Sequence, residues 1–141
     1  AELAAREQRA GLTSLAPYLR FEERVRETRR RLLDFLAAAK QEGASIAAYG
    51  AAAKGNTLLN YCGVGAETID YVVDRNPHKQ GSYLPGTHLP IHPPERLFET
   101  RPDLVFILPW NIKQEVMEQM AGIAEWGGRF FVAIPEVEIC G

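Results

Sequence analysis

The stretch from Ser45 to Thr57 has the residue types and spacing of a phosphate-binding turn. A short apolar run ends at Gly50, and Ala52 and Gly55 follow in a G-x-G-x-x-G pattern whose middle glycine is alanine. Small residues are needed there because the backbone bends sharply at Gly50, approaches the ligand near Ala52 and brings helix and strand together at Gly55. The N-terminus of the next helix would offer unpaired N–H groups and a partial positive charge to an anion. The plainer interpretation is that the glycines only permit tight packing.

A carboxylate stands where the second half of this nucleotide-binding pattern needs one. The apolar run from Ile69 ends at Asp74, close to the offset of roughly 20 residues at which an acid accepts hydrogen bonds from a ribose diol. The two halves together predict a nucleotide-type ligand. The alternative is that Asp74 only begins the next loop.

Further polar side chains follow the predicted strands, at the end where parallel sheets bind their ligands. The candidates for substrate binding are Gly50, Ala52, Gly55, Asn56, Thr57, Asp74, Asn76, Lys79, Trp110 and Asn111. Trp110 is placed to stack on a base or sugar, or else forms an edge of the core. Asn111 with Gln114 also matches a helix N-cap with a capping-box partner, a role that needs no ligand.

Two titratable residues are candidates for catalysis. Lys54 lies at the predicted helix start, where its ammonium group could reach a diphosphate or an enolate oxygen. His78 is the other candidate, because histidine is the side chain most often used for proton transfer near neutral pH. Both side chains have the plainer interpretation of solvated surface. Because Lys54 precedes Gly55, the turn is not a Walker A loop, which argues against phosphoryl transfer.

The hydrophobic pattern divides the chain into a helical region, residues 1–44, and an α/β domain, residues 45–141. An amphipathic helix carries Phe21, Val25, Leu32 and Leu36 on one face, with a break expected at Pro17 and a separate helical arm before it. From Ser45 on, strands and helices alternate, with strands expected over 45–49, 69–73, 89–91, 104–108 and 129–134 and helices over 54–61, 93–99 and 112–124. This pattern predicts a three-layer Rossmann-like domain whose five-stranded, mainly parallel sheet has the order 3-2-1-4-5.

Composition narrows the range of partners. The chain has 141 residues, a net charge of −2 and mixed signs throughout, which gives no electrostatic footprint for nucleic acid. No apolar run is long enough to cross a bilayer, so neither a membrane nor nucleic acid is an expected partner. Cys62 and Cys140 lack metal-ligand spacing, so no metal site is expected, and a reduced, cytoplasmic setting is the simplest one. The first residue is Ala1, and we expect the chain to be part of a larger protein.

Four longer strings occur in order along the chain. They are Tyr-Gly-Ala-Ala-Ala-Lys-Gly-Asn-Thr from Tyr49, Val-Asp-Arg-Asn-Pro-His-Lys-Gln-Gly from Val73, Leu-Pro-Gly-Thr-His from Leu84 and Leu-Pro-Trp-Asn-Ile from Leu108. In these strings the sequence resembles the C-terminal domain of SAM-dependent sugar C-methyltransferases. The resemblance implies a small zinc-binding N-terminal domain and a central domain that binds S-adenosylmethionine (SAM), both upstream of this chain. It also implies methylation of a carbon next to a keto group in a nucleotide-linked deoxysugar. Residues 50–57 and 74–79 would then face the nucleotide sugar or the interface with the methyltransferase domain, and the isolated chain would be inactive.

A second hypothesis stays open. A non-catalytic Rossmann module that binds NAD or CoA, or that serves only as a structural or interaction domain, would carry the same turn and the same acid. The loop over residues 75–88 is longer and more polar than a plain connection, which favours an extended ligand.

Overall fold

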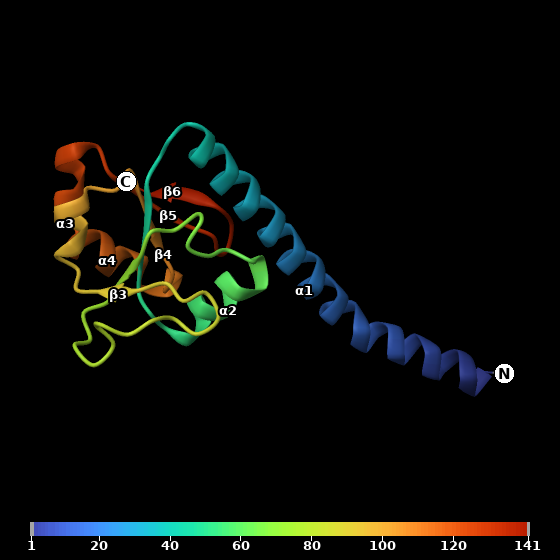
Figure 1. The fold of residues 1–141 in the computed structure, drawn as a ribbon. Coiled ribbons are helices and arrows are strands. Elements are labelled where there is room, and N and C mark those ends of the chain that lie inside the picture. Colours follow the sequence, from blue (N-terminus) through green and yellow to red (C-terminus); the bar gives the residue numbers. More distant parts are fainter. Residues whose placement is uncertain (1, 141) are drawn as a thin grey trace.

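A single twisted sheet organises the α/β part of the chain in the computed structural model, which describes the backbone of residues 2–140 and the side chains of residues 22–140 (Figure 1). Its strands are β1 (Ile46–Tyr49), β2 (Val72–Val73), β3 (Ile91–His92), β4 (Leu104–Ile107), β5 (Arg129–Val132) and β6 (Glu138–Cys140). Their order is β3-β2-β1-β4-β5-β6, with β1 to β5 parallel and β6 antiparallel to β5. The predicted Rossmann-like order of the first five strands is confirmed.

Helices cover both faces of the sheet, as the three-layer prediction requires. They are α1 (Glu2–Gln41), α2 (Ala53–Cys62), α3 (Arg96–Thr100) and α4 (Lys113–Gln119), with 3-10 turns η1 (Trp110–Ile112) and η2 (Ala121–Trp126). Buried residues of α1 and α2, among them Leu36 and Leu59, form one core layer with the sheet. Leu97 of α3, Val116 of α4 and Ile123 of η2 form the other. Figure 1 shows these two groups of helices on opposite sides of the strands.

The second half of α1 belongs to the core of the domain. Leu32, Leu36 and Ala39 are buried against the sheet, whereas Val25 lies half-buried further along the same face. The side chain of Phe21 lies outside the described residues. The predicted break at Pro17 is wrong, since α1 is one continuous helix from Glu2 to Gln41. A proline removes only one backbone hydrogen bond, and the turns on either side can carry the helix past it.

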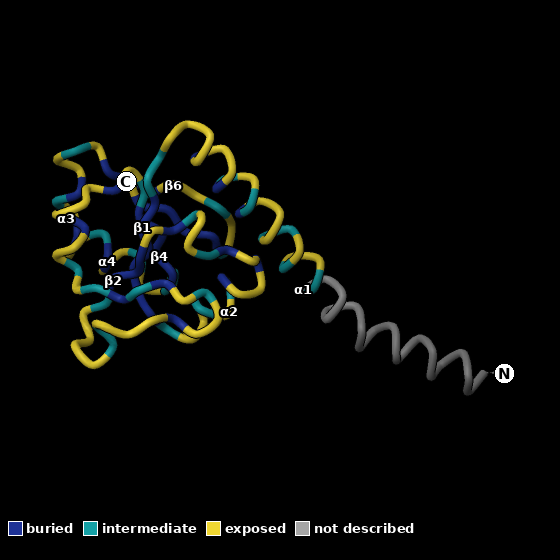
Figure 2. The backbone as a smooth tube through the Cα atoms, viewed as in Figure 1, coloured by how far each residue is buried: buried dark blue, intermediate teal, exposed yellow. Residues whose placement is uncertain are grey.

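The central strands are buried on both faces because helices cover both sides. All four residues of β1 are buried, and Figure 2 shows buried backbone concentrated along the strands. The ring of Phe131 stacks on Phe106 with ring centres 4.5 Å apart and meets Phe35 of α1 at 4.7 Å. These contacts attach α1 to the centre of the sheet. Among the helices described here, none is both long and apolar enough to cross a bilayer.

The structure differs from the predicted elements at two places near the end of the chain. Strand β6, with Cys140 opposite Phe130, was not predicted because three residues with a leading glutamate give no readable alternation. The helix expected over 112–124 ends at Gln119, and η2 replaces its second half. Gly122, a poor helix former, lies in η2 where an added Cβ would come within 2.8 Å of the Phe98 ring.

Candidate functional site at the carboxyl edge of the sheet

The turn after β1 has the backbone geometry that its glycines predict. Gly50 has a φ of +98°, and a Cβ atom there would lie 2.5 Å from Cδ of Pro109, which follows β4. A Cβ atom at Gly55 would lie 2.5 Å from Cβ of Leu108. The sharp bend at Gly50 and the close packing of helix and strand at Gly55 are therefore both confirmed.

The carboxylate of Asp74 joins the end of β2 to this turn. Its Oδ2 accepts the backbone N–H of Ala51 at 2.8 Å, and its Oδ1 accepts the N–H of Asn76 at 2.8 Å. The sequence placed Asp74 at this edge but did not reveal these partners. Each carboxylate oxygen retains room for a second hydrogen bond, so the ribose contact stays a prediction.

A second side chain of the loop after β2 also bonds to the glycine turn. Lys79 donates from Nζ to the carbonyl oxygen of Ala51 at 3.0 Å, so both backbone polar groups of Ala51 are held by side chains of this loop. Gln80 donates from Nε2 to the carbonyl oxygen of Asp74 at 2.8 Å. The Asn76 side chain accepts the N–H of His78 at 3.0 Å. The predicted residues Asp74, Asn76 and Lys79 therefore form one network around the glycine turn.

The N-terminus of α2 faces the same edge with its first-turn N–H groups uncapped by any described side chain. Ala52 precedes the helix in extended conformation, and the first turn contains Lys54 and no acid. Both features favour an anion at this helix end. The side chains of Lys54 and His78 are exposed at the surface of this edge.

Two polar residues of α2 point their hydrogen bonds into the helix instead. Thr57 donates from Oγ1 to the carbonyl oxygen of Ala53 at 2.9 Å. The Asn56 side chain accepts from Nδ2 of Asn60 at 3.2 Å. Their predicted contacts with a substrate stay predictions.

The segment after β4 contains one correction. Asn111 lies inside η1, and the residue that precedes α4 is Ile112, with no side-chain cap among the described residues. The capping interpretation of Asn111 is therefore wrong, because the N–H of Ile112 bonds to the carbonyl of Pro109 and tightens the chain into a 3-10 turn first. Trp110 is half-buried against the core layer under α4, which agrees with its interpretation as a core edge.

A family model for the C-methyltransferase C-terminal domain matches residues 1–135. The chain belongs to this family. It is 34% identical over 139 residues to "C-methyltransferase NovU" of Streptomyces niveus, an alignment that includes 99% of this chain and 33% of that relative. This C-methyltransferase C-terminal domain thus spans about a third of the length of the curated relative it matches.

A hollow of about 580 Å³ opens in this C-methyltransferase domain between the loop after β2, the segment after β3 and the end of α4. It is lined by Arg75, Gln80, Pro93, Pro94, Glu95, Gln119 and Met120. None of the predicted site residues lines it, although Gln80 bonds to Asp74 directly. Arg75 could be noticed in the sequence because it directly follows Asp74, whereas Gln119 at the end of α4 becomes its neighbour only through folding.

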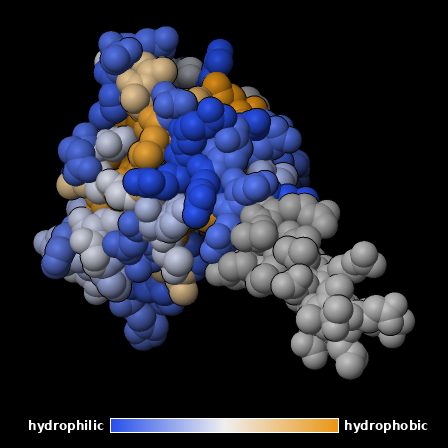
Figure 3. All heavy atoms as spheres, turned by 90° about the vertical axis from the view of Figure 1, so that its right-hand side faces the viewer, coloured by the Kyte–Doolittle hydropathy of each residue, from blue (hydrophilic) through white to orange (hydrophobic). Residues whose placement is uncertain are grey.

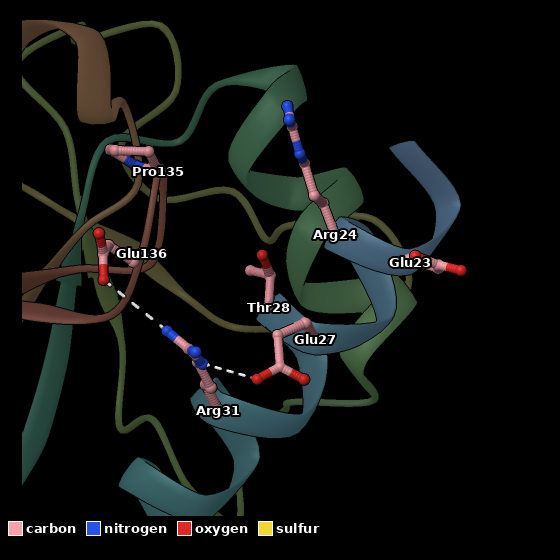
Figure 4. A pocket seen from close by; sticks show the side chains of 7 residues that line it. All are labelled: Glu23, Arg24, Glu27, Thr28, Arg31, Pro135 and Glu136. Atoms are coloured by element: carbon pink, nitrogen blue, oxygen red, sulfur yellow. Dashed lines mark hydrogen bonds and ion pairs between the residues drawn. The ribbon is translucent and has the colours of Figure 1, made fainter. Parts of the chain in front are cut away.

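A hollow of about 740 Å³ lies elsewhere, between α1 and the turn after β5 (Figure 4). Figure 4 shows Arg31 reaching between Glu27 and Glu136, and its ion pairs with them measure 2.8 and 3.7 Å. Hydrogen bonds from Arg30 and Arg31 hold the pKa of Glu27 below its ordinary value. The face seen in Figure 3 is correspondingly mostly hydrophilic. This hollow is not part of the candidate site, because its charged side chains pair with one another and none of the predicted site residues lines it.

Buried groups near the sheet stay neutral at physiological pH. Burial raises the pKa of Tyr49, so its hydroxyl remains protonated and donates to Oε1 of Gln119 at 3.2 Å. Burial likewise raises the pKa of the Cys62 thiol. Within residues 22–140, no cluster of three or more His, Cys, Asp or Glu side chains is arranged to hold a metal ion.

Proposed function

We propose that this chain is the nucleotide-sugar-binding C-terminal domain of a SAM-dependent C-methyltransferase that acts on a keto-deoxysugar nucleotide. The observation that carries the proposal is the uncapped N-terminus of α2, with Lys54 in its first turn, behind a glycine turn held rigidly by Asp74 and Lys79. Fixed N–H groups and a nearby ammonium group suit the diphosphate of such a substrate. Membership of the C-methyltransferase family supports the reaction class.

The chemistry of that reaction assigns roles to this edge. In the complete enzyme, a base would remove the proton from the carbon next to the ketone, and SAM would supply the methyl group that this carbon takes up. We assign Lys54 to the diphosphate or to the enolate oxygen, and His78 to proton transfer or to donation toward that oxygen. Asp74 holds the ribose, and Asn76, Trp110 and Asn111 line the path of the sugar.

SAM is placed on a further domain of the complete enzyme. The described part of this chain has one glycine-rich strand–turn–helix unit, and the nucleotide sugar occupies it in this proposal. A structural zinc ion, if the complete enzyme carries one, is assigned to an upstream domain as well. This chain alone is expected to bind a nucleoside diphosphate, to bind SAM weakly or not at all, and to methylate no sugar.

Calorimetric titration of this chain tests the proposal. We expect binding of nucleoside diphosphates, about tenfold weaker binding by Lys54→Met, and an unchanged melting temperature, because Lys54 is exposed and the loss of one charge-assisted contact costs about 1.4 kcal/mol. Lys40→Met, which removes an exposed lysine at the far end of α1, is the matched control and should bind like the parent. Micromolar binding of SAM, or of NAD in place of nucleoside diphosphates, would contradict the proposal.

A further inference from the structure

The hollow that Arg75 and Pro93 line joins segments that follow β2, β3 and β4, near the carboxyl edge of the sheet. Arg75 and Gln80 come from the loop after β2, Pro93 and Pro94 follow β3, and Gln119 and Met120 end α4. Its volume of about 580 Å³ lies in the range of small-molecule sites. Open α/β sheets bind ligands at this edge, so the position alone makes the hollow a candidate subsite.

The end of α4 presents a hydrogen-bond donor to the hollow. Oε1 of the exposed Gln119 accepts the hydroxyl of Tyr49 at 3.2 Å, and Tyr49 is buried at the end of β1 with 5% of its surface exposed. This contact favours the orientation of the carboxamide in which Oε1 faces the phenol. Nε2 of Gln119 has no hydrogen bond to the described residues and is left to donate.

The loop after β2 presents an acceptor to the same hollow. Nε2 of Gln80 donates to the carbonyl oxygen of Asp74 at 2.8 Å, which leaves Oε1 of Gln80 free to accept. The same Asp74 holds the glycine turn through Ala51. The acceptor is thus tied to the turn that precedes α2.

The remaining lining suits a flat ring. Pro93, Pro94 and the buried Met120 supply apolar contact, and the guanidinium group of Arg75 can stack on a ring face. The carboxylate of Glu95 also lines the hollow and offsets the positive charge of Arg75, so the lining has no net charge to attract a phosphate. The N-terminus of α2, with Lys54 and no acid in its first turn, favours a phosphate more strongly.

We propose that this hollow binds the heterocyclic base of the nucleotide whose phosphates lie at the N-terminus of α2. The proposal rests on the proposed function and adds the residues that read the base. Gln119 donates to a ring acceptor, Gln80 accepts from a ring N–H, and the prolines and Met120 contact the ring face. Protein pockets that read a single base combine such edge contacts with stacking.

Calorimetry with UDP, TDP, ADP, GDP and pyrophosphate tests this assignment. In Gln119→Met, which keeps the length of the side chain and removes the amide, the dissociation constant of the preferred nucleoside diphosphate should rise about tenfold. The dissociation constant of pyrophosphate should not change. Gln114→Met makes the same replacement on an exposed residue of α4 outside the hollow and should match the parent with every probe.

The outcomes separate this assignment from the proposed function. Equal nucleoside diphosphate binding by Gln119→Met and Gln114→Met would place the base elsewhere and leave the proposed function intact. Loss of pyrophosphate binding in Gln119→Met would also overturn the assignment, since the hollow would then hold phosphate. If the parent chain bound none of these probes, both proposals would be wrong. In NMR spectra, the side-chain amide signals of Gln80 and Gln119 should shift with the nucleotide and not with pyrophosphate.

Discussion

Asp74 accepts the backbone N–H of Ala51 at 2.8 Å, so the carboxylate at the end of β2 fixes the turn that follows β1. Lys79 holds the carbonyl oxygen of the same residue at 3.0 Å. Two side chains from one loop thus fix both polar groups of a single peptide position. Because the turn is already ordered, a ligand that binds at the N-terminus of α2 does not have to order it first.

Replacing Asp74 with alanine should lower the free energy of unfolding by about 1.5 to 3 kcal/mol, because the N–H of the buried Ala51 and the N–H of Asn76 both lose their acceptor. Urea unfolding measures this loss. Asp70→Ala, on an exposed acid just before β2, is the control and should stay within about 0.5 kcal/mol of the parent. A similar loss in both variants would mean that the clamp on Ala51 contributes nothing of its own.

Gly50→Ala should destabilise the protein more than Gly43→Ala, although both residues have positive φ values of +98° and +81°. A Cβ atom at Gly50 meets Pro109 at 2.5 Å, whereas a Cβ atom at Gly43 meets nothing within 4 Å. Backbone strain costs about 1 to 2 kcal/mol at each site, and the clash should add about 1 to 3 kcal/mol at Gly50 alone. Thermal melts of the two variants would show the difference, and equal melting temperatures would contradict the close approach of Pro109.

The sequence predicts the fold better than it predicts the site. Gly50, Gly55 and Asp74 could be placed because a strand–turn–helix imposes local spacing on small residues and on the following acid. Their partners Pro109, Leu108 and Ala51 come from other strands or from folding of the turn, so spacing along the chain does not reveal them.

The hollow illustrates the same limit at longer range. Gln119 meets Tyr49 across a sequence separation of 70 residues. Tyr49 lies in a predicted strand and Gln119 in a predicted helix, but no spacing along the chain pairs the two residues. The prediction that Asn111 caps a helix was wrong for a different reason, because a 3-10 turn competes with the capping box over the same few residues. When two local patterns favour different turns equally, the packing of the whole segment decides which turn forms.

Leu32→Ala should lower the free energy of unfolding by about 2.5 to 5 kcal/mol, because Leu32 is fully buried where α1 packs on the sheet. Leu33→Ala is the matched comparison on the same helix, and its half-buried side chain should cost clearly less. Chemical unfolding followed by circular dichroism gives both values. If the two losses were equal and small, α1 would not be part of the core of the domain.

Stability should fall as the pH rises through the alkaline range, because burial raises the pKa values of Cys62, Tyr49 and Tyr71 in the folded chain. An acid whose pKa is raised by folding loses its proton at a lower pH in the unfolded chain than in the folded one. Its contribution to the free energy of unfolding is therefore complete below the unfolded pKa and declines above it. With ordinary values of about 8.5 for cysteine and about 10 for tyrosine, the decline should begin near pH 8.5 and steepen toward pH 10.5. Urea unfolding at pH 7.5, 9 and 10.5 measures the slope of the free energy of unfolding against pH.

The variant Tyr71→Phe tests the part played by one buried phenol. It also loses the hydrogen bond to Thr100, which shifts stability at every pH, but only the removal of a titrating group makes the slope shallower. Tyr83→Phe, at a tyrosine that is 62% exposed, is the control and should leave the slope unchanged. If Tyr71→Phe kept the parent slope while its overall stability changed, ionisation of this buried phenol would play no part in alkaline unfolding.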